Sequence, residues 1–349
     1  MHDDDTSDGG QVVGTTPRSP IAAAARSALA SVQPVPGVAK PDPILVADGV
    51  SRTFGGITAV DVAHCEVQRG SITALIGPNG AGKTTFFNLL TGFDKPDTGA
   101  WQFDGRDLAG VAAHKVANAG MVRTFQLTKS LTKLAVIENM KLGATGQTGE
   151  RWWNALIPAL WTAQERDIEA RAMELLARFK LDDKRDHFAG TLSGGQRKLL
   201  EMARALMVQP QLVMLDEPMA GVNPALKQNL NTHIKGLRDD GMTVLFVEHD
   251  MDMVHDVADW VIVMAEGRVI AEGTPDQISS NDAVIDAYLG SHQGQSLLDD
   301  EFVVDDAVIA DLEAEGVHLG ADGTVDLPHD HDHEHDHQHD HQHDTEDRS

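Results

Sequence analysis

The chain has 349 residues, of which 41% are hydrophobic, and it carries a formal net charge of −26. This length and apolar content are sufficient for a sizeable hydrophobic core. The single cysteine, Cys65, excludes an internal disulfide and is typical of a reducing compartment. No run of about 18 apolar residues occurs, and Arg26 interrupts the Ala-rich stretch near the amino terminus, so the sequence predicts neither a membrane span nor a secretory signal.

The acidic charge is concentrated at the carboxyl end. Residues 291–349 contain 18 Asp and Glu against the single Arg348, which gives a net charge of −17. Residues 1–42 contribute −2, from five acidic and three basic residues, and this leaves −7 for residues 43–290. Because nucleic acid is bound by basic surfaces, we expect no nucleic-acid partner.

The first segment, residues 1–42, is rich in Asp, Gly, Thr, Ser, Ala and Pro and lacks a sustained apolar period. This composition predicts a largely disordered extension. Order is expected from Pro43, where Ile44-Leu45-Val46 gives a short strand signal. We predict one ordered domain over residues 43–292.

A strand, a glycine-rich loop and a helix follow one another between residues 71 and 91. Ser71–Ile76 is a continuous apolar run of strand length, as in buried parallel strands. Thr84–Thr91 is predicted to be a helix with Phe86, Leu89 and Leu90 on one side. The loop between them fits the pattern GxxxxGK[ST], and its residues are Gly77, Pro78, Asn79, Gly80, Ala81, Gly82, Lys83 and Thr84.

This loop has the chemistry of a phosphate-binding loop. Its glycines allow backbone N–H groups to turn inward around phosphate oxygens, and the following helix adds the positive end of its dipole. Lys83 is expected to reach the β- and γ-phosphates of a nucleotide, the Thr84 hydroxyl to ligate Mg²⁺, and Thr85 to complete the site. The alternative is an ordinary glycine-rich turn, which the flanking strand and helix disfavour.

The chain is predicted to be helical from about Leu127 to Leu206. Arg166–Lys180 places five large apolar residues on one broad helical face. Near the end of this block, Ser193, Gly194, Gly195 and Gln196 directly precede a helical run. A hydroxyl and glycine amides at a helix amino terminus form an anion site.

A second apolar strand, Leu212–Leu215, ends in two carboxylates. Asp216 at the strand tip can hold Mg²⁺ through a water molecule. Glu217 can then orient or deprotonate an attacking water as a general base. Taken alone, two carboxylates at a strand end are more often merely solvated.

The rest of the domain alternates between strands and helices. A polar helical stretch over Ala225–Arg238 is followed by an apolar strand, Thr243–Val247, and then by His249. A final hairpin is predicted for Trp260–Met264 and Val269–Ala271. This alternation, with an inserted helical block, predicts an α/β fold with a helical subdomain.

The segment Leu192–Lys198, LSGGQRK, resembles the signature of ABC ATPases, which other phosphate-loop proteins lack. The resemblance implies an α/β phosphate-loop NTPase core of the ABC ATPase type, with an antiparallel β subdomain and an inserted helical subdomain at about 127–206. It also implies that ATP and Mg²⁺ bind between two cassettes in a head-to-tail dimer. The signature Ser193-Gly194-Gly195-Gln196 would then close over the γ-phosphate held by the other subunit.

The resemblance assigns roles to further residues. Gln126 matches the glutamine that contacts Mg²⁺ and the attacking water, and His249 matches the histidine that touches the γ-phosphate. Phe54 lies where the family places an aromatic that stacks on adenine, although a core-packing phenylalanine is an equal alternative. Asn223 stands where the family typically has Asp, which puts the usual charge-based dimer contact in doubt.

Within the family, residues 44–292 are most similar to the ATPases of branched-chain amino acid importers. The marks of that branch are Phe54-Gly55-Gly56, Phe86–Gly92, Val122–Gln126, Ala220–Pro224 and the ending Ala287–Gly290. Gly194 departs from the residue often found in that branch but matches the general family pattern. A longer segment after Gln126 contains Trp152, Trp153 and Trp161, which suit either a hydrophobic contact surface or packing within the subdomain.

This branch implies several partners. A second cassette, identical or homologous, would complete the dimer, and two membrane permeases and an external solute-binding protein would complete the transporter. The chain would then be a peripheral subunit on the cytoplasmic face of the cell membrane. Two alternatives stay open, the ATPase of a lipopolysaccharide-type exporter and a soluble, non-transport ABC protein. The RTFQ segment disfavours the first, and the single cassette with its acidic charge disfavours the second.

Beyond the domain, the sequence predicts an acidic linker over residues 293–328 and a disordered tail over residues 329–349. Histidine occupies every second position of this tail, with Asp, Glu or Gln between. Imidazoles bind Zn²⁺ and Ni²⁺, so the tail is a candidate metal-binding segment, the alternative being a solvated tail. The eight residues are His329, His331, His333, His335, His337, His339, His341 and His343.

Overall fold

The computed structural model describes residues 19–124, 131–144, 158–222, 224–296, 318–319 and 325–326. Gln126, Asn223, Trp152, Trp153 and the eight tail histidines lie outside these residues. The chain divides into two units, Met1–His292 and Gln293–Ser349. In the second unit the structure describes one antiparallel pair, β11 (His318–Leu319) and β12 (Val325–Asp326).

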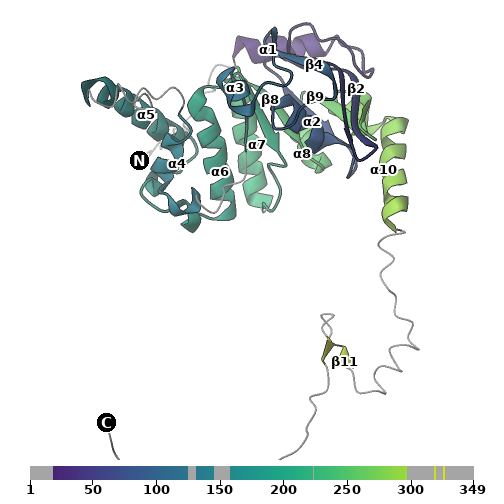
Figure 1. The fold of residues 1–349 in the computed structure, drawn as a ribbon. Helices are drawn as coiled ribbons and strands as arrows, with labels where there is room; N and C mark the ends of the chain where they lie inside the picture. Colours follow the sequence, from purple (N-terminus) through teal and green to yellow (C-terminus); the bar gives the residue numbers. More distant parts are fainter. Residues whose placement is uncertain are drawn as a thin grey trace, which may run out of the picture. The chain divides into compact units, whose positions relative to one another are not determined.

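The larger sheet of the first unit has six described strands in the order β10-β9-β3-β8-β7-β6. Figure 1 labels β8 and β9 of this sheet. Its strands run parallel to their neighbours, except that β10 pairs with β9 in the antiparallel sense. The carboxyl ends of β3, β7 and β8 therefore meet at one edge. The strands are β3 (Ile72–Ile76), β6 (Met121–Arg123), β7 (Leu212–Asp216), β8 (Thr243–Val247), β9 (Trp260–Ala265) and β10 (Arg268–Gly273).

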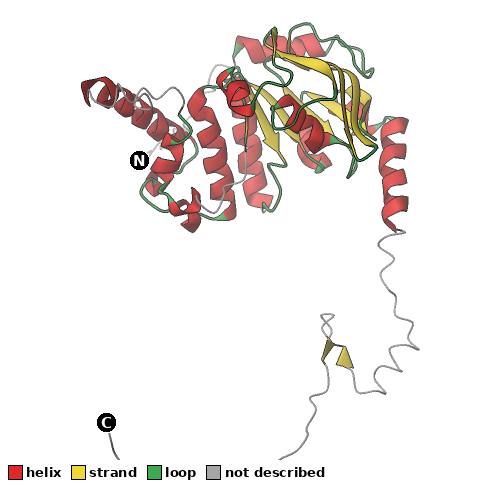
Figure 2. Ribbon diagram, in the orientation of Figure 1, coloured by secondary structure: helices red, strands yellow, loops and turns green. Residues whose placement is uncertain are grey.

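The second sheet is antiparallel, with four strands in the order β2-β1-β4-β5. Its strands are β1 (Pro43–Phe54), β2 (Ile57–Gln68), β4 (Thr98–Phe103) and β5 (Arg106–Asp107). Helix α2 (Lys83–Leu90) shares a buried apolar cluster with both sheets. Figure 2 shows the strands and helices of this region in the orientation of Figure 1. This cluster contains Phe86 and Phe87 of α2 and Trp101 of β4. The helix that follows the phosphate loop is thereby packed against the antiparallel sheet as well as against the larger one.

Most described residues between β6 and β7 are helical, as the sequence predicts. Ile72, Ala74 and Ile76 of β3 face the apolar cluster that these helices share with the larger sheet. The helices there are α4 (Val136–Lys141), α5 (Pro158–Arg178) and α6 (Gly194–Ala205), with the 3-10 turns η1 (Leu131–Lys133), η3 (Asp182–Lys184), η4 (Ala189–Thr191) and η5 (Leu206–Val208). The remaining helices are α3 (Ala113–Asn118), α7 (Pro224–Asp239), α8 (Met251–Val257), α9 (Pro275–Ser279) and α10 (Asp282–Ser296).

The described part of the amino-terminal extension differs from the disorder that its composition predicts. Residues Pro20–Leu29 form helix α1, in which Ala22, Ala25 and Leu29 are buried. The Ser19 amide donates to the Asp239 carbonyl at 3.0 Å, which ties the start of α1 to the end of α7. Small alanines permit close packing at helical spacing, and this burial offsets the entropy of ordering the segment.

A buried ion pair holds the end of this extension. Lys40 Nζ lies 2.6 Å from Glu272 Oε2 of β10, and both side chains have no exposed surface. Glu272 also accepts hydrogen bonds from the Trp260 indole at 3.0 Å and from the Gly37 amide at 2.9 Å. The carboxylate thus joins residues 37–40 to the β9–β10 hairpin.

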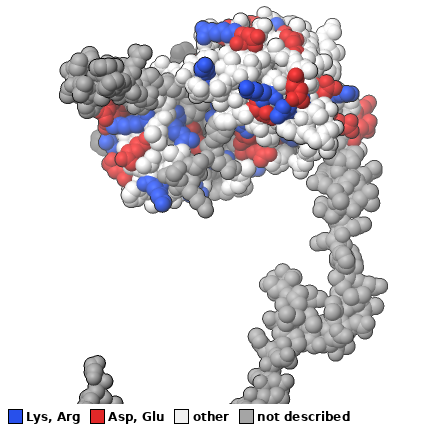
Figure 3. Space-filling model, in the orientation of Figure 1, with Lys and Arg blue, Asp and Glu red and all other residues white. Residues whose placement is uncertain are grey.

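The surface in Figure 3 carries interspersed basic and acidic side chains over the described residues. Within those residues, no helix combines the length and the apolar character needed to cross a bilayer.

Candidate nucleotide site

The phosphate-binding loop connects β3 to α2 and requires glycine at defined positions. Gly77 and Gly82 have φ angles of +146° and +92°. A Cβ atom on Gly77 would lie 1.9 Å from the Met264 carbonyl oxygen, and one on Gly82 would lie 2.2 Å from the Ala59 carbonyl oxygen. Conformation and space therefore both exclude side chains, so the backbone amides line the loop.

Lys83 begins helix α2, and its side chain folds across the loop. The amine donates to the carbonyls of Gly77 at 2.7 Å and Pro78 at 2.9 Å. Burial lowers the pKa of this amine, while the nearby Glu217 charge opposes that shift. Gly82 provides no side-chain cap, which leaves the first N–H groups of α2 for phosphate oxygens.

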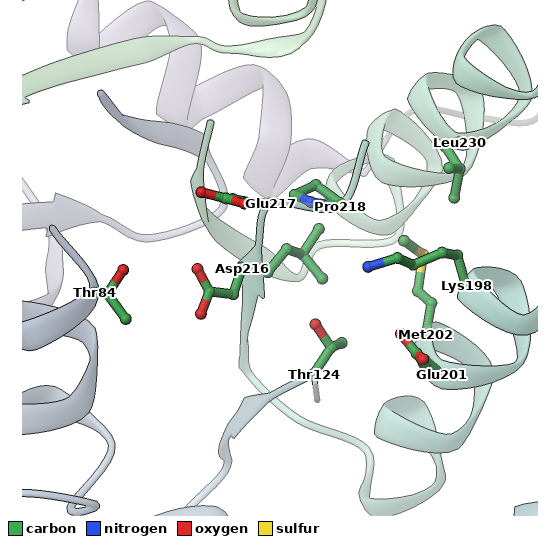
Figure 4. A pocket seen from close by; sticks show the side chains of 10 residues that line it. Thr84, Thr124, Lys198, Glu201, Met202, Asp216, Glu217, Pro218 and Leu230 are labelled. Carbon is green, nitrogen blue, oxygen red and sulfur yellow. The ribbon is translucent and has the colours of Figure 1, made fainter. Parts of the chain in front are cut away.

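Two oxygen donors predicted for Mg²⁺ face one cavity of about 580 Å³. In Figure 4 the Asp216 carboxylate points toward Thr84, from the end of β7 toward the start of α2. A hydroxyl and a carboxylate are the hard oxygen ligands that Mg²⁺ prefers, so the donor set fits this ion. The cavity is lined by Thr84, Thr124, Lys198, Glu201, Met202, Leu215, Asp216, Glu217, Pro218 and Leu230.

Glu217 lines the same cavity and occupies a strained backbone position. Its φ angle is +43°, in the left-handed region that non-glycine residues rarely adopt. The Glu217 amide donates to the Val247 carbonyl of β8 at 3.0 Å, and this hydrogen bond fixes the peptide there. Such strain is characteristic of functional positions, and Glu217 is an exposed residue beside the two predicted Mg²⁺ ligands.

His249 follows β8, and its side chain is 65% exposed. Its backbone is held by the neighbouring Glu248, which is buried. Glu248 accepts hydrogen bonds from the Met219 amide at 2.8 Å and from the His249 amide at 3.2 Å. Glu248 thus joins the turn after Glu217 to the histidine, a role that the sequence analysis missed. The sequence offers one signal for this role of Glu248, which is a carboxylate placed directly after an apolar strand.

The signature residues begin helix α6 with a capping box. The Ser193 hydroxyl accepts from the Gln196 amide at 3.3 Å, and the Gln196 side chain accepts from the Ser193 amide at 3.0 Å. Gly195 packs so closely that a Cβ would lie 1.3 Å from Leu226 Cδ2. Ser193 and Gly194 are exposed. The cap presents the helix amino terminus to solvent.

Ser193, Gly194, Gly195 and Gln196 do not line the cavity that contains Thr84, Asp216 and Glu217, although Lys198 further along α6 does. Gly194 borders a neighbouring hollow of about 250 Å³, together with the turn Ala220–Val222, and Lys198 and Glu201 line both hollows. Within the described residues, the phosphate loop and the Ser193–Gln196 segment therefore face different hollows of one chain. This arrangement suits a nucleotide shared by two copies.

Phe54, at the end of β1, has a side chain that is 47% exposed, and the Arg52 guanidinium lies 4.7 Å from its ring centroid. A phenylalanine packed in the core is therefore the wrong alternative. Stacking of Phe54 on adenine stays a prediction.

Comparisons with known proteins agree with this geometry. The family model described as ABC transporter matches residues 60–220, and the one described as branched-chain amino acid ATP-binding cassette transporter matches residues 268–293. The probable branched-chain amino acid transport ATP-binding protein LivG of Archaeoglobus fulgidus is 40% identical over 252 residues, which cover 72% of this chain and 97% of the relative. The high-affinity branched-chain amino acid transport ATP-binding protein BraF of Pseudomonas aeruginosa is 39% identical over 251 residues, which cover 71% of this chain and 98% of the relative.

A solved structure, the ADP conformation of an ATP-binding cassette of an ABC transporter, superposes with a TM-score of 0.63. It is 35% identical to this chain and covers 71% of it, and the match spans 99% of the solved chain. The sequence and the fold thus agree with relatives that are matched over almost their whole length. The chain therefore belongs to the ABC transporter family, in which an ATPase cassette works as a dimer at the membrane with separate permease subunits, and within that family to the branch of the branched-chain amino acid cassettes.

Proposed function

We propose that this chain is the ATP-hydrolysing subunit of an importer for branched-chain amino acids or related solutes. The observation that carries the proposal is the match of residues 268–293 to the branched-chain amino acid cassette model, outside the region common to ABC transporters. The names of the two relatives support the same solute class. Nothing comparable favours a lipopolysaccharide-type exporter or a soluble ABC protein.

In the proposed mechanism the chain's own groups divide the work on ATP. The loop amides and Lys83 hold the phosphates, and Glu217 accepts the proton of the attacking water. Bound Mg²⁺, held by Thr84 and Asp216, would neutralise phosphate charge. Ser193 and the Gly194 and Gly195 amides of a second cassette would bind the γ-phosphate at their helix terminus. Gln126, outside the described residues, and His249 would complete the shell around the water.

The proposed transporter has three kinds of partner. A second cassette, identical or homologous, completes the nucleotide site, and two permeases form the pathway across the membrane. An external solute-binding protein delivers the solute, as expected for an importer. The chain then docks on the cytoplasmic face of the membrane, which agrees with the absence of a spanning helix among its described residues.

Uptake of radiolabelled leucine tests this proposal. A strain lacking the gene is complemented with the wild-type chain or with the Glu217→Gln variant at matched expression. Wild type should restore uptake and the variant should not. Uptake that is unchanged by the deletion would refute the solute class, and uptake restored by the variant would refute ATP hydrolysis as its driving force.

We further propose that the histidine-rich tail binds Zn²⁺ or Ni²⁺ when its imidazoles are neutral. The alternation of eight histidines with acidic residues between His329 and His343 supports this, because imidazole and carboxylate oxygens together complete a metal shell. Calorimetry with Zn²⁺ tests metal binding by the tail. It compares the intact chain, a chain ending at residue 328 and a chain with all eight histidines replaced by asparagine. Equal heats for the three proteins would refute metal binding.

A further inference from the structure

Arg123 makes the principal side-chain contact to the Asp216 carboxylate. It lies at the end of β6, and its Nη2 donates to Asp216 Oδ2 on the neighbouring strand β7. Its Nη1 donates to the Asn88 side-chain oxygen of α2 at 2.6 Å. The Arg123 side chain is 7% exposed and the Asp216 side chain 26% exposed, so water screens the pair mainly from the side of the carboxylate.

A further contact holds the guanidinium, and a backbone hydrogen bond holds the neighbouring residue. It lies 5.7 Å from the ring centroid of Phe87, which is buried in α2. The Thr124 amide, one residue further, donates to the Met214 carbonyl of β7 at 2.9 Å. Arg123 is therefore held in register with the strand that carries Asp216.

The arrangement joins both predicted Mg²⁺ ligands. Asn88 lies one helical turn after Thr84, so the two residues share a face of α2. Arg123 thus links the helix carrying the hydroxyl ligand to the strand carrying the carboxylate ligand. Its planar fork can hold both partners at once, which the point charge of a lysine cannot do.

We propose that Arg123 is a positioning residue for the Mg²⁺ site. By binding Asp216 Oδ2 it sets the rotamer of the carboxylate and leaves Oδ1 directed at the hydrated ion. The proposal rests on the assignment of Thr84 and Asp216 to Mg²⁺, which stands independently of the transported solute. Removal of a group that hydrogen-bonds to a metal ligand commonly weakens metal affinity about ten- to a hundredfold.

Arg238 provides a matched control, because it makes the same kind of pair away from the loop. It donates to Asp239 at 3.0 Å and to Asp259 at 2.9 Å, and its side chain is 8% exposed. Replacing it with glutamine removes an equally buried, doubly bonded arginine. An effect confined to Arg123 therefore separates positioning of the metal ligand from loss of a structural ion pair.

The test measures Mn²⁺ binding by paramagnetic resonance in the presence of saturating ADP, for wild type, Arg123→Gln, Arg123→Lys, Arg238→Gln and Asp216→Asn. Metal-free ADP affinity is measured in parallel with a chelator present, and folding is checked by circular dichroism. We expect Arg123→Gln to weaken Mn²⁺ binding about tenfold or more. Metal-free affinity should change by less than about threefold, Arg123→Lys should be intermediate and Arg238→Gln should resemble wild type.

Each outcome supports or overturns the proposal. Wild-type Mn²⁺ affinity in both Arg123 variants, together with a loss in Asp216→Asn, would overturn the positioning role alone. Wild-type affinity in Asp216→Asn would overturn the assignment of the metal ligand and the proposal with it. An equal loss in Arg238→Gln would reduce Arg123 to a structural brace and overturn the proposal. If Arg123→Gln fails to fold, Arg123→Lys decides the question.

Discussion

Glu217 has a strained backbone and an exposed position, and we propose that its carboxylate is the general base of the site. Glutamine keeps the size of the side chain but cannot accept a proton from water. We expect Glu217→Gln to lower phosphate release by about 10²- to 10⁴-fold, the usual contribution of a general base. ATP affinity, followed with a fluorescent nucleotide, should stay within about threefold of wild type. Near-normal turnover would show that another group activates the water.

We propose that Lys83 contributes to nucleotide binding rather than to activation of the attacking water. Its amine already lies against the loop carbonyls of Gly77 and Pro78, where a phosphate would add the charge that compensates its burial. Lys83→Ala should therefore weaken ATP binding tenfold or more, which corresponds to at least about 1.4 kcal/mol. The same fluorescence titration on Lys235→Ala, at an exposed lysine far along the chain, serves as the control. Unchanged ATP affinity in Lys83→Ala would contradict the role.

Two glycines of the loop allow the effect of backbone conformation to be distinguished from the effect of steric crowding. Gly80 and Gly82 both have positive φ, but only Gly82 faces a backbone oxygen, whereas a Cβ on Gly80 meets nothing within 4 Å. Gly80→Ala should cost only the conformational strain, about 1–2 kcal/mol. Gly82→Ala must also displace the Ala59 carbonyl, so its melting temperature and ATP affinity should fall further. Equal effects on both quantities would show that the close approach at Gly82 is unimportant.

Much of the residue-level site could be predicted because its chemistry is local in the sequence. Lys83, Thr84, Asp216 and Glu217 follow strand signals directly, and the structure brings the last three to one cavity. Arg123 and Glu248 stand close to Gln126 and His249, to which the sequence assigned roles, but neither of them was assigned a role from the sequence. Their partners lie on other strands and helices, so their function emerges only when the chain is folded.

At the level of elements, the extension before β1 is the largest difference from the sequence-based prediction. Composition indicated disorder over residues 1–42, yet α1 buries three apolar residues and Lys40 pairs with Glu272. Alanine carries a weak hydrophobic signal, and a partner 232 residues away leaves no local trace. By contrast, apolar runs predicted β3, β7 and β8 to within a residue, since buried parallel strands have no polar face.

The Lys40–Glu272 pair gives a test of how firmly this extension is held. Lys40→Met removes the cation and leaves Glu272 buried with a negative charge, which typically costs about 3–5 kcal/mol. Lys235→Met breaks a pair whose side chains are 35% and 52% exposed, and it should cost less than about 1 kcal/mol. Urea unfolding of the two variants measures the difference. Equal stabilities would show that residues 37–40 contribute little to the domain.

At the level of the whole molecule, the pattern of apolar runs predicted the α/β core and the helical insertion, whereas the antiparallel sheet was predicted through the resemblance alone. The antiparallel sheet illustrates the limit, because only three residues of the twelve-residue strand β1 gave a strand signal. Strand β1 also pairs with β4, and the paired residues, from Ser51↔Thr98 to Leu45↔Phe103, lie 47 to 58 positions apart in the chain. The buried residues of this sheet pack in the same apolar cluster as α2, a contact that appears only when the chain is folded.

The separation of the phosphate loop from the signature has one direct consequence for assembly. If each cassette supplies half of a nucleotide site, as we propose, ATP should hold two cassettes together and ADP should not. The Glu217→Gln variant preserves the ATP-bound state long enough to observe this. Lys83→Ala in the same background removes nucleotide binding and serves as the control.

Light scattering tests the shared nucleotide site most directly. It measures the molar mass of Glu217→Gln in solution, once with Mg-ATP and once with Mg-ADP. The measurement is made on the chain alone and with the homologous cassette of the same transporter. With ATP the mass should equal two cassettes, and with ADP it should equal one. A mass of one cassette under both conditions, with ATP demonstrably bound, would contradict a nucleotide site shared between two subunits.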